Sequence, residues 1–142
     1  MADPRTRTGG RAVAVGTAVL VFLLVAPHDP VLGQNDFAAA EAAARADADT
    51  ADGKQFAEAL GETFGREHGR TIQQCAKNSK RTDLSDFDIL VRVDGTGLVD
   101  QAFVKPTTTL ATCVVGKLVG WNTSVPPRVG FWAKIGVNLK GK

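Results

Sequence analysis

Apolar residues recur along the chain with two different periods, and these periods predict the secondary structure. Between residues 54 and 75 the apolar side chains recur every fourth residue, which is the spacing of one face of an amphipathic helix. Residues 87–93 and 131–139 instead alternate apolar and polar positions, which is typical of a β-strand with one buried face. The helical face consists of Phe56, Leu60, Phe64, His68 and Ile72.

Turn and capping residues predict two further elements. Residues 94–97 (Asp-Gly-Thr-Gly) are a strong reverse-turn signal, and Gly97 suits the positive-φ position of a three-residue hairpin loop. Residues 98–104 then form the returning strand. From Leu110 to Trp121 the apolar spacing is helical, after a threonine run that offers an N-cap, although β-branched residues in this segment favour a strand.

The predicted order is helix, strand, strand, helix, strand, and it is compatible with one antiparallel sheet. The third strand returns after a crossover helix, so it runs parallel to the second and can only be antiparallel to the first. We therefore expect an α+β fold with strand order 2-1-3, two helices on one face and the third strand at an exposed edge. The predicted core is Phe64, Ile72, Ile89, Val91, Leu110, Leu118, Trp121 and Ile135.

The first 33 residues have the pattern of a secretory signal peptide. Arg5, Arg7 and Arg11 precede an uninterrupted small and apolar run at residues 12–26, and a polar stretch that ends Val31-Leu32-Gly33 follows it. The run is short for a membrane span, which needs about 20 residues. We expect export with cleavage near Gly33, and an uncleaved membrane anchor is the alternative.

Residues 34–53 are rich in alanine and aspartate and hold one large apolar side chain, Phe37. Alanine favours helix, but the segment has no apolar stripe to bury. We interpret it as a spacer, either frayed helix or disordered chain, between the signal and a domain at residues 54–142.

Cys75 and Cys113 are the two cysteines of the chain, and both follow the predicted signal. An even number of cysteines in an oxidising compartment favours one disulfide, here joining the two predicted helices. Two cysteines without a histidine at ligand spacing are too few for a structural zinc site.

The sequence carries no catalytic pattern. His68 lies on the apolar face of the first helix, where a structural role is the better interpretation. Asp83, Asp86 and Asp88 do not continue as a calcium loop, so we interpret them as a solvated charged segment. With a net charge of only +2, the chain has no overall excess of basic residues of the kind that nucleic-acid binding requires. We therefore expect no enzymatic activity, metal, cofactor, small-molecule substrate or nucleic-acid partner.

Residues 87–99, the crossover helix leading to Trp121 and the following residues 126–127 (Pro-Pro) resemble the C-terminal domain of TonB-type energy transducers. They are more similar still to the TonB-like modules of myxobacterial gliding-motility proteins (the AgmX type). Those modules carry one cysteine on the helix before strand 1 and one on the crossover helix, and Cys75 and Cys113 stand at these places. The chain lacks the family's long Pro-rich arm and its Tyr-Pro opening, and its crossover is shorter.

The resemblance implies protein binding by strand addition, in which a partner's extended segment joins the free edge of residues 131–139. The expected partner-binding residues are Phe131, Trp132, Lys134, Gly136 and Asn138. On the predicted open face Trp132, Lys134 and Asn138 would give selectivity, and Lys134 with Lys140 would favour an acidic partner. The alternative is that these lysines protect an edge strand against aggregation.

The resulting expectation is a non-enzymatic binding or assembly module in the periplasm or cell envelope of a bacterium. The rival interpretation is a structural accessory subunit of a membrane or envelope complex, held by an uncleaved N-terminal helix. In either case membrane association is expected only through the N-terminal segment.

Overall fold

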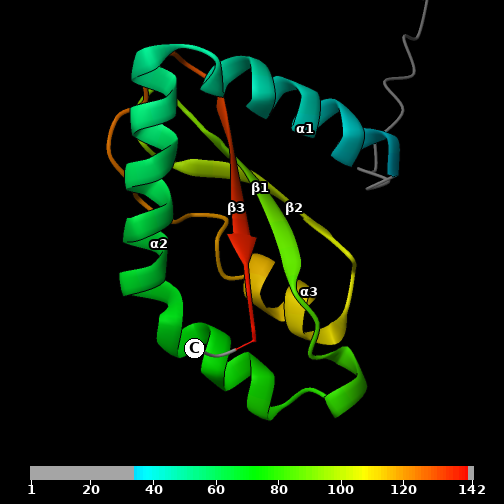
Figure 1. The fold of residues 1–142 in the computed structure, drawn as a ribbon. Helices are drawn as coiled ribbons and strands as arrows, with labels where there is room; N and C mark the ends of the chain where they lie inside the picture. Colours follow the sequence, from blue (N-terminus) through cyan, green and yellow to red (C-terminus); the bar gives the residue numbers. More distant parts are fainter. Residues whose placement is uncertain (1–33, 141–142) are drawn as a thin grey trace, which may run out of the picture. The chain divides into compact units, whose positions relative to one another are not determined.

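The computed structural model describes residues 34–140, so the predicted signal peptide lies outside the described residues. The elements in chain order are α1 (Gln34–Ala48), α2 (Ala51–Lys77), a 3₁₀ turn (Arg81–Asp83), β1 (Phe87–Val93), β2 (Val99–Lys105), α3 (Thr109–Val115) and β3 (Phe131–Val137) (Figure 1). Within residues 34–140 no helix is both long and apolar enough to cross a membrane.

The sheet has the order β2-β1-β3, and both strand pairs are antiparallel, which confirms the predicted topology. Ile89 in the central strand lies opposite Val104 on one side and Ile135 on the other. The chain passes from β2 to β3 through α3 and a long loop.

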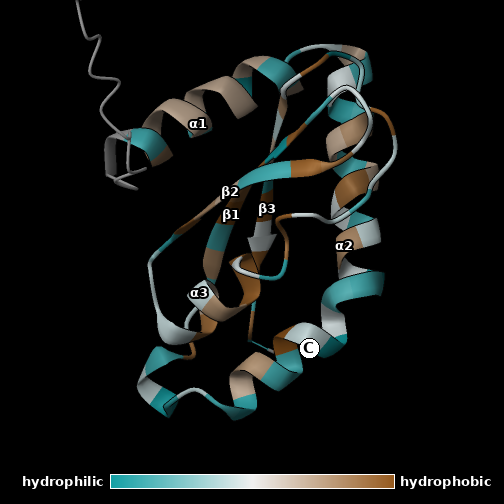
Figure 2. Ribbon diagram, turned by 180° about the vertical axis from the view of Figure 1, so that it is seen from behind, coloured by the Kyte–Doolittle hydropathy of each residue, from teal (hydrophilic) through white to brown (hydrophobic). Residues whose placement is uncertain are grey.

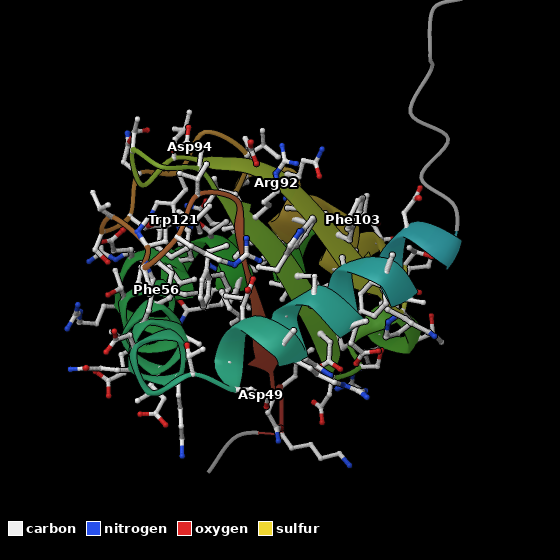
Figure 3. All side chains as sticks on the ribbon, turned by 90° about the horizontal axis from the view of Figure 1, so that it is seen from above. Asp49, Phe56, Arg92, Asp94, Phe103 and Trp121 are labelled. Atoms are coloured by element: carbon white, nitrogen blue, oxygen red, sulfur yellow. A yellow bond between two sulfur atoms is a disulfide. The ribbon has the colours of Figure 1, made fainter. Side chains whose placement is uncertain are left out.

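Helices α2 and α3 cover one face of the sheet, as predicted, and the main core lies between them and the strands. The odd-numbered residues of β1 point into this core, and its central members Ile89 and Val91 are fully buried. The predicted core residues all belong to this cluster, with Ile72 only partly buried at its margin. Figure 3 shows Phe56 and Trp121 on the α2 side of the sheet.

Helix α1 covers the opposite face of the sheet, so the interpretation of residues 34–53 as a spacer is wrong. Ala40 and Ala44 are buried against Leu90, and Phe103 and Trp132 pack around them. In Figure 2 the middle of α1 is tan, as expected for alanine, and Figure 3 shows Phe103 beside this helix. The large side chains come from the strands, and alanine lets the helix approach them closely.

A tight junction joins α1 to α2. The side chain of Thr50 caps α2 by accepting a hydrogen bond from the Gly53 N–H at 3.0 Å. A Cβ placed on Gly53 would lie 1.8 Å from the backbone oxygen of Asp47, so this position requires glycine. The junction therefore fixes the end of α1 against the first turn of α2.

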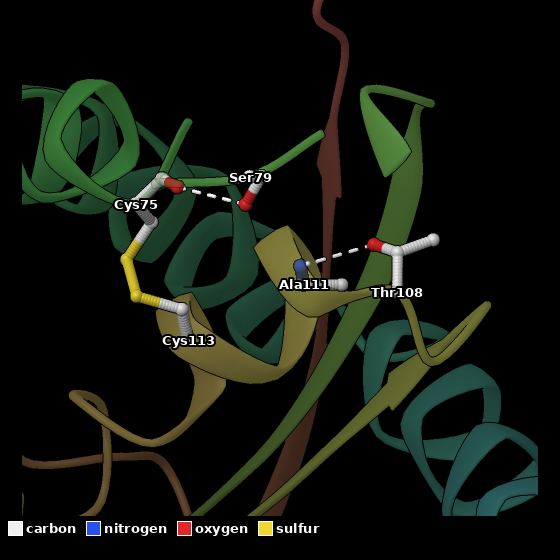
Figure 4. The surroundings of a disulfide bond; sticks show 5 residues. All are labelled: Cys75, Ser79, Thr108, Ala111 and Cys113. Atoms are coloured by element: carbon white, nitrogen blue, oxygen red, sulfur yellow. Dashed lines mark hydrogen bonds between the residues drawn. A yellow bond between two sulfur atoms is a disulfide. The ribbon is translucent and has the colours of Figure 1, made fainter. Parts of the chain in front are cut away.

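The predicted disulfide between Cys75 and Cys113 is present, with the two Cα atoms 5.8 Å apart, and it joins α2 to α3 (Figure 4). Thr108 caps α3 through the Ala111 N–H, as the threonine run predicted. Helix α3 ends at Val115 and not at Trp121, because Gly116 closes it and the Trp121 carbonyl accepts the Val99 N–H. The last strand also ends early, at Val137, and the Leu139 N–H binds Asp86 instead.

Candidate binding edge of the sheet

The outer edge of β3 carries backbone groups that the sheet leaves unpaired. The Trp132 N–H points away from β1, because it donates to the Asp47 carboxylate at 2.8 Å. Alternate residues of an antiparallel strand point the same way, so the N–H groups of Lys134 and Gly136 also face outward. Neither N–H has an acceptor among residues 34–140. The predicted sheet edge therefore exists, and its free part begins at Lys134.

A groove of about 540 Å³ runs between this edge and α2. Its strand side is formed by residues 134–138, and Ala48 at the end of α1 contributes to the lining. On the helix side Gly61 and Gly65 leave open space, since a Cβ at either position would meet nothing within 4 Å. The remaining lining residues are Lys54, Ala57, Glu58, Phe64 and Ile72.

Asp47 holds the beginning of β3 in place. Its buried carboxylate accepts hydrogen bonds from Nε and Nη2 of Arg128, at 2.5 and 2.6 Å, and from the backbone of Trp132. One side chain thus connects α1, the loop before β3 and the edge of β3. Nothing local in the sequence points to this role, because Asp47 lies among other acids and its partners are more than 80 residues away.

Lys134 is engaged within the protein, contrary to the prediction that it lies free on an open face. Its Nζ is 3.0 Å from Glu41 Oε1 on α1 and 2.9 Å from Asp88 Oδ2 on β1. Hydrogen bonds to Asp88 and Glu41 raise the pKa of Lys134, and the Lys134 ammonium lowers the pKa of Glu41. Glu41 also pairs with Arg45 at 3.5 Å, so Lys134 belongs to a balanced group of two carboxylates and two cations and is not a free charge that would attract an acidic partner.

Other predicted contact residues have different positions. Phe131 belongs to the core, where its ring centroid is 4.9 Å from that of Phe56 in an edge-to-face arrangement. Trp132 is half-buried beside α1 and stacks on Phe103 at 5.6 Å, so it is not on an open face. Gly136 and Asn138 do line the groove.

His68 lies in an aromatic environment on α2, which supports its structural interpretation. Its ring stacks on Phe64 at 5.3 Å and meets Trp121 edge-to-face at 4.7 Å. Burial lowers the pKa of His68, and the nearby Glu67, which accepts the Trp121 indole N–H, acts weakly in the opposite direction. Among the described residues no cluster of metal-ligating side chains is found.

Comparison with known proteins returns no matching family model, no matching curated protein and no matching solved structure. The similarity to TonB-like domains therefore stays a prediction from the sequence.

Proposed function

We propose that this protein is a binding module that captures an extended segment of a protein partner by strand addition to β3. The observation that carries the proposal is the pair of outward backbone positions, Lys134 and Gly136, facing a groove that they share with α2. Unpaired N–H and C=O groups on a strand edge are complementary to another extended backbone.

The length of the free edge limits the occupant. Trp132 already donates to Asp47, and after Val137 the chain leaves the sheet. At about 3.4 Å per residue, the interval from Lys134 to Asn138 accepts a strand of roughly five residues. Paired in antiparallel fashion, the residues opposite Lys134 and Gly136 would each exchange two hydrogen bonds with β3.

The groove also distinguishes this edge from the other edge of the sheet. At the β2 edge the backbone of Val99 is already paired with Gly120 and Trp121. At the β3 edge, α2 forms a wall that would bury one face of an added strand. An added strand therefore gains side-chain burial as well as main-chain hydrogen bonds, and the burial of apolar surface adds to the affinity that the hydrogen bonds provide.

A proline at position 136 tests the proposal. Because the Gly136 N–H points away from β1, Gly136→Pro removes an outer donor and leaves the β1–β3 hydrogen bonds in place. Peptides would first be selected on the full chain from a displayed library of random seven-residue sequences. We expect Gly136→Pro to weaken the selected peptides by at least about tenfold, and the matched Gly136→Ala, which keeps the donor, to have little effect.

Amide hydrogen exchange gives the second measurement. Bound peptide should slow exchange at Lys134 and Gly136 and leave the outer edge of β2 unchanged. Equal binding to the proline and alanine variants, or protection confined to another surface, would contradict strand addition at β3.

A further inference from the structure

We propose that the β3 edge selects an extended segment with the pattern apolar–basic–apolar. The inference rests on the proposed strand addition and specifies which side chains the captured segment carries. It follows from the two different environments that the alternate side chains of an added strand would meet. The pattern reads the same in both chain directions, so it does not depend on the polarity of the bound strand.

The apolar positions lie opposite Ile135 and Val137. These two residues point to the α2 side of the sheet, and directly opposed residues of neighbouring strands place their side chains on the same face. Two side chains of the bound strand would therefore enter the groove between β3 and α2. There they meet the open space beside Gly61 and Gly65.

Charges on the groove wall do not oppose apolar side chains. Lys54 and Glu58 line this wall one helical turn apart and have opposite signs, so they balance each other. Phe64 and Ile72 supply apolar surface within the groove. Burial of two apolar side chains at this wall is therefore favourable.

The basic position lies opposite Gly136, on the α1 side of the sheet. Asp88 Oδ1 is 3.6 Å from the place that a Cβ on Gly136 would occupy, so the missing side chain leaves this oxygen open toward the edge. The other oxygen of Asp88 pairs with Lys134, and the Asp88 side chain is 45% exposed. A residue paired with Gly136 would have its Cα about 5.5 Å away, which brings a lysine or arginine head group within reach of Asp88.

The local charge balance supports the same assignment. Glu41 pairs with both Lys134 and Arg45, at 3.0 and 3.5 Å, whereas Asp88 pairs with Lys134 alone through Oδ2 and is 45% exposed, so Asp88 is the less compensated carboxylate of this group. A cation in the captured segment would pair with the Asp88 carboxylate, and an acidic residue there would be repelled by it. The preferred partner is therefore basic at this position, the opposite of what the lysines of the sequence alone suggested.

Three seven-residue peptides test the pattern on the full chain. Their central residues are Val-Lys-Val, Val-Glu-Val or Ser-Lys-Ser, with identical threonine flanks and blocked ends. By fluorescence anisotropy at low salt we expect Val-Lys-Val to bind about tenfold more tightly than Val-Glu-Val. Replacing both valines by serine should cost at least another tenfold.

Variants identify the groups responsible. Asp88→Asn should bring the Val-Lys-Val and Val-Glu-Val affinities to within about twofold of each other, since the open carboxylate is lost. Gly61→Leu should fill the groove and weaken Val-Lys-Val, whereas the matched Gly69→Leu, on the same helix but outside the groove, should not. A Gly61→Leu protein that binds Val-Lys-Val as wild type does would overturn the apolar part of the pattern.

The outcomes separate this inference from the proposed function. If Val-Lys-Val and Val-Glu-Val bind equally and both slow amide exchange at Gly136, the charge selectivity is overturned and strand addition stands. If no peptide slows exchange at Lys134 or Gly136, strand addition itself fails, and the inference fails with it.

Discussion

At the scale of single residues, His68 has an environment that suits its neutral form. Aromatic rings flank it on two sides, and its Nε2 is buried without a hydrogen-bond partner among residues 34–140. Burial disfavours the charged imidazolium, which is why the pKa of His68 lies below its ordinary value of 6.5.

This pKa shift predicts how stability depends on pH. Below pH 6.5 the unfolded chain takes up a proton at His68 more readily than the folded chain, so the free energy of unfolding should fall as the pH falls from 6.5 through the lowered pKa. His68→Phe keeps an aromatic ring between Phe64 and Trp121 and removes the titration. Urea denaturation from pH 5 to 7.5 should therefore give a flatter profile for the variant. Parallel profiles would contradict a lowered pKa at His68.

Asp47 marks the limit of what single residues reveal in a sequence. Its carboxylate joins α1 to Arg128 and to the backbone of β3, yet no neighbouring residue distinguishes it from the other acids of an alanine-rich segment. Long-range partners of this kind follow from the fold and cannot be found from local spacing. The sequence likewise predicted an open face at Trp132 and Lys134, because the local spacing does not reveal that α1 covers it.

At the scale of elements, periodicity predicted well wherever an element buries one apolar face. The long helix and strands β1 and β3 follow from such patterns, and the observed α2 and β1 match them closely. Strand β2 was predicted from the turn before it, and the strand order from the connectivity. Helix α1 has no large apolar stripe, so the same criterion missed it. One signal was present: Leu90 is apolar at a position of β1 where the alternation calls for a polar residue, and it is fully buried beneath α1.

The glycines of α2 illustrate opposite requirements within one helix. Gly69 has open space at its Cβ position, so Gly69→Ala should raise the free energy of unfolding by about 1 kcal/mol through helix propensity. Gly53 has backbone 1.8 Å from that position, so Gly53→Ala must move the α1–α2 junction and should lower stability by about 2 kcal/mol. Chemical denaturation of both variants measures the contrast. A destabilised Gly69→Ala would show that α2 requires glycine there.

At the scale of the whole described molecule, the sheet is enclosed on both faces, by α2 and α3 on one and by α1 on the other. Helices therefore cover most of both faces of the sheet, and the part of the sheet that a partner can reach is an edge. The disulfide joins the two helices of one layer, whereas Asp47 and Lys134 join α1 to β3. Phe56 of α2 also packs on Phe131 of β3, so β3 is held by contacts from both layers, which gives the proposed binding site a fixed geometry.

The packing of α1 on the sheet can be tested by substitutions on its two sides. Ala44 lies on the side of α1 that faces the sheet and is 4% exposed, whereas Ala42 on the same helix faces solvent. Ala44→Leu adds methyl groups to a closely packed contact with the Leu90 face and should lower the free energy of unfolding by about 1–3 kcal/mol. The matched Ala42→Leu should stay within about 0.5 kcal/mol of wild type. Chemical denaturation followed by tryptophan fluorescence checks both, because Trp132 lies in the affected layer. If the two variants are equally stable, α1 does not pack on the sheet in solution, and the face of Trp132 is open as the sequence first suggested.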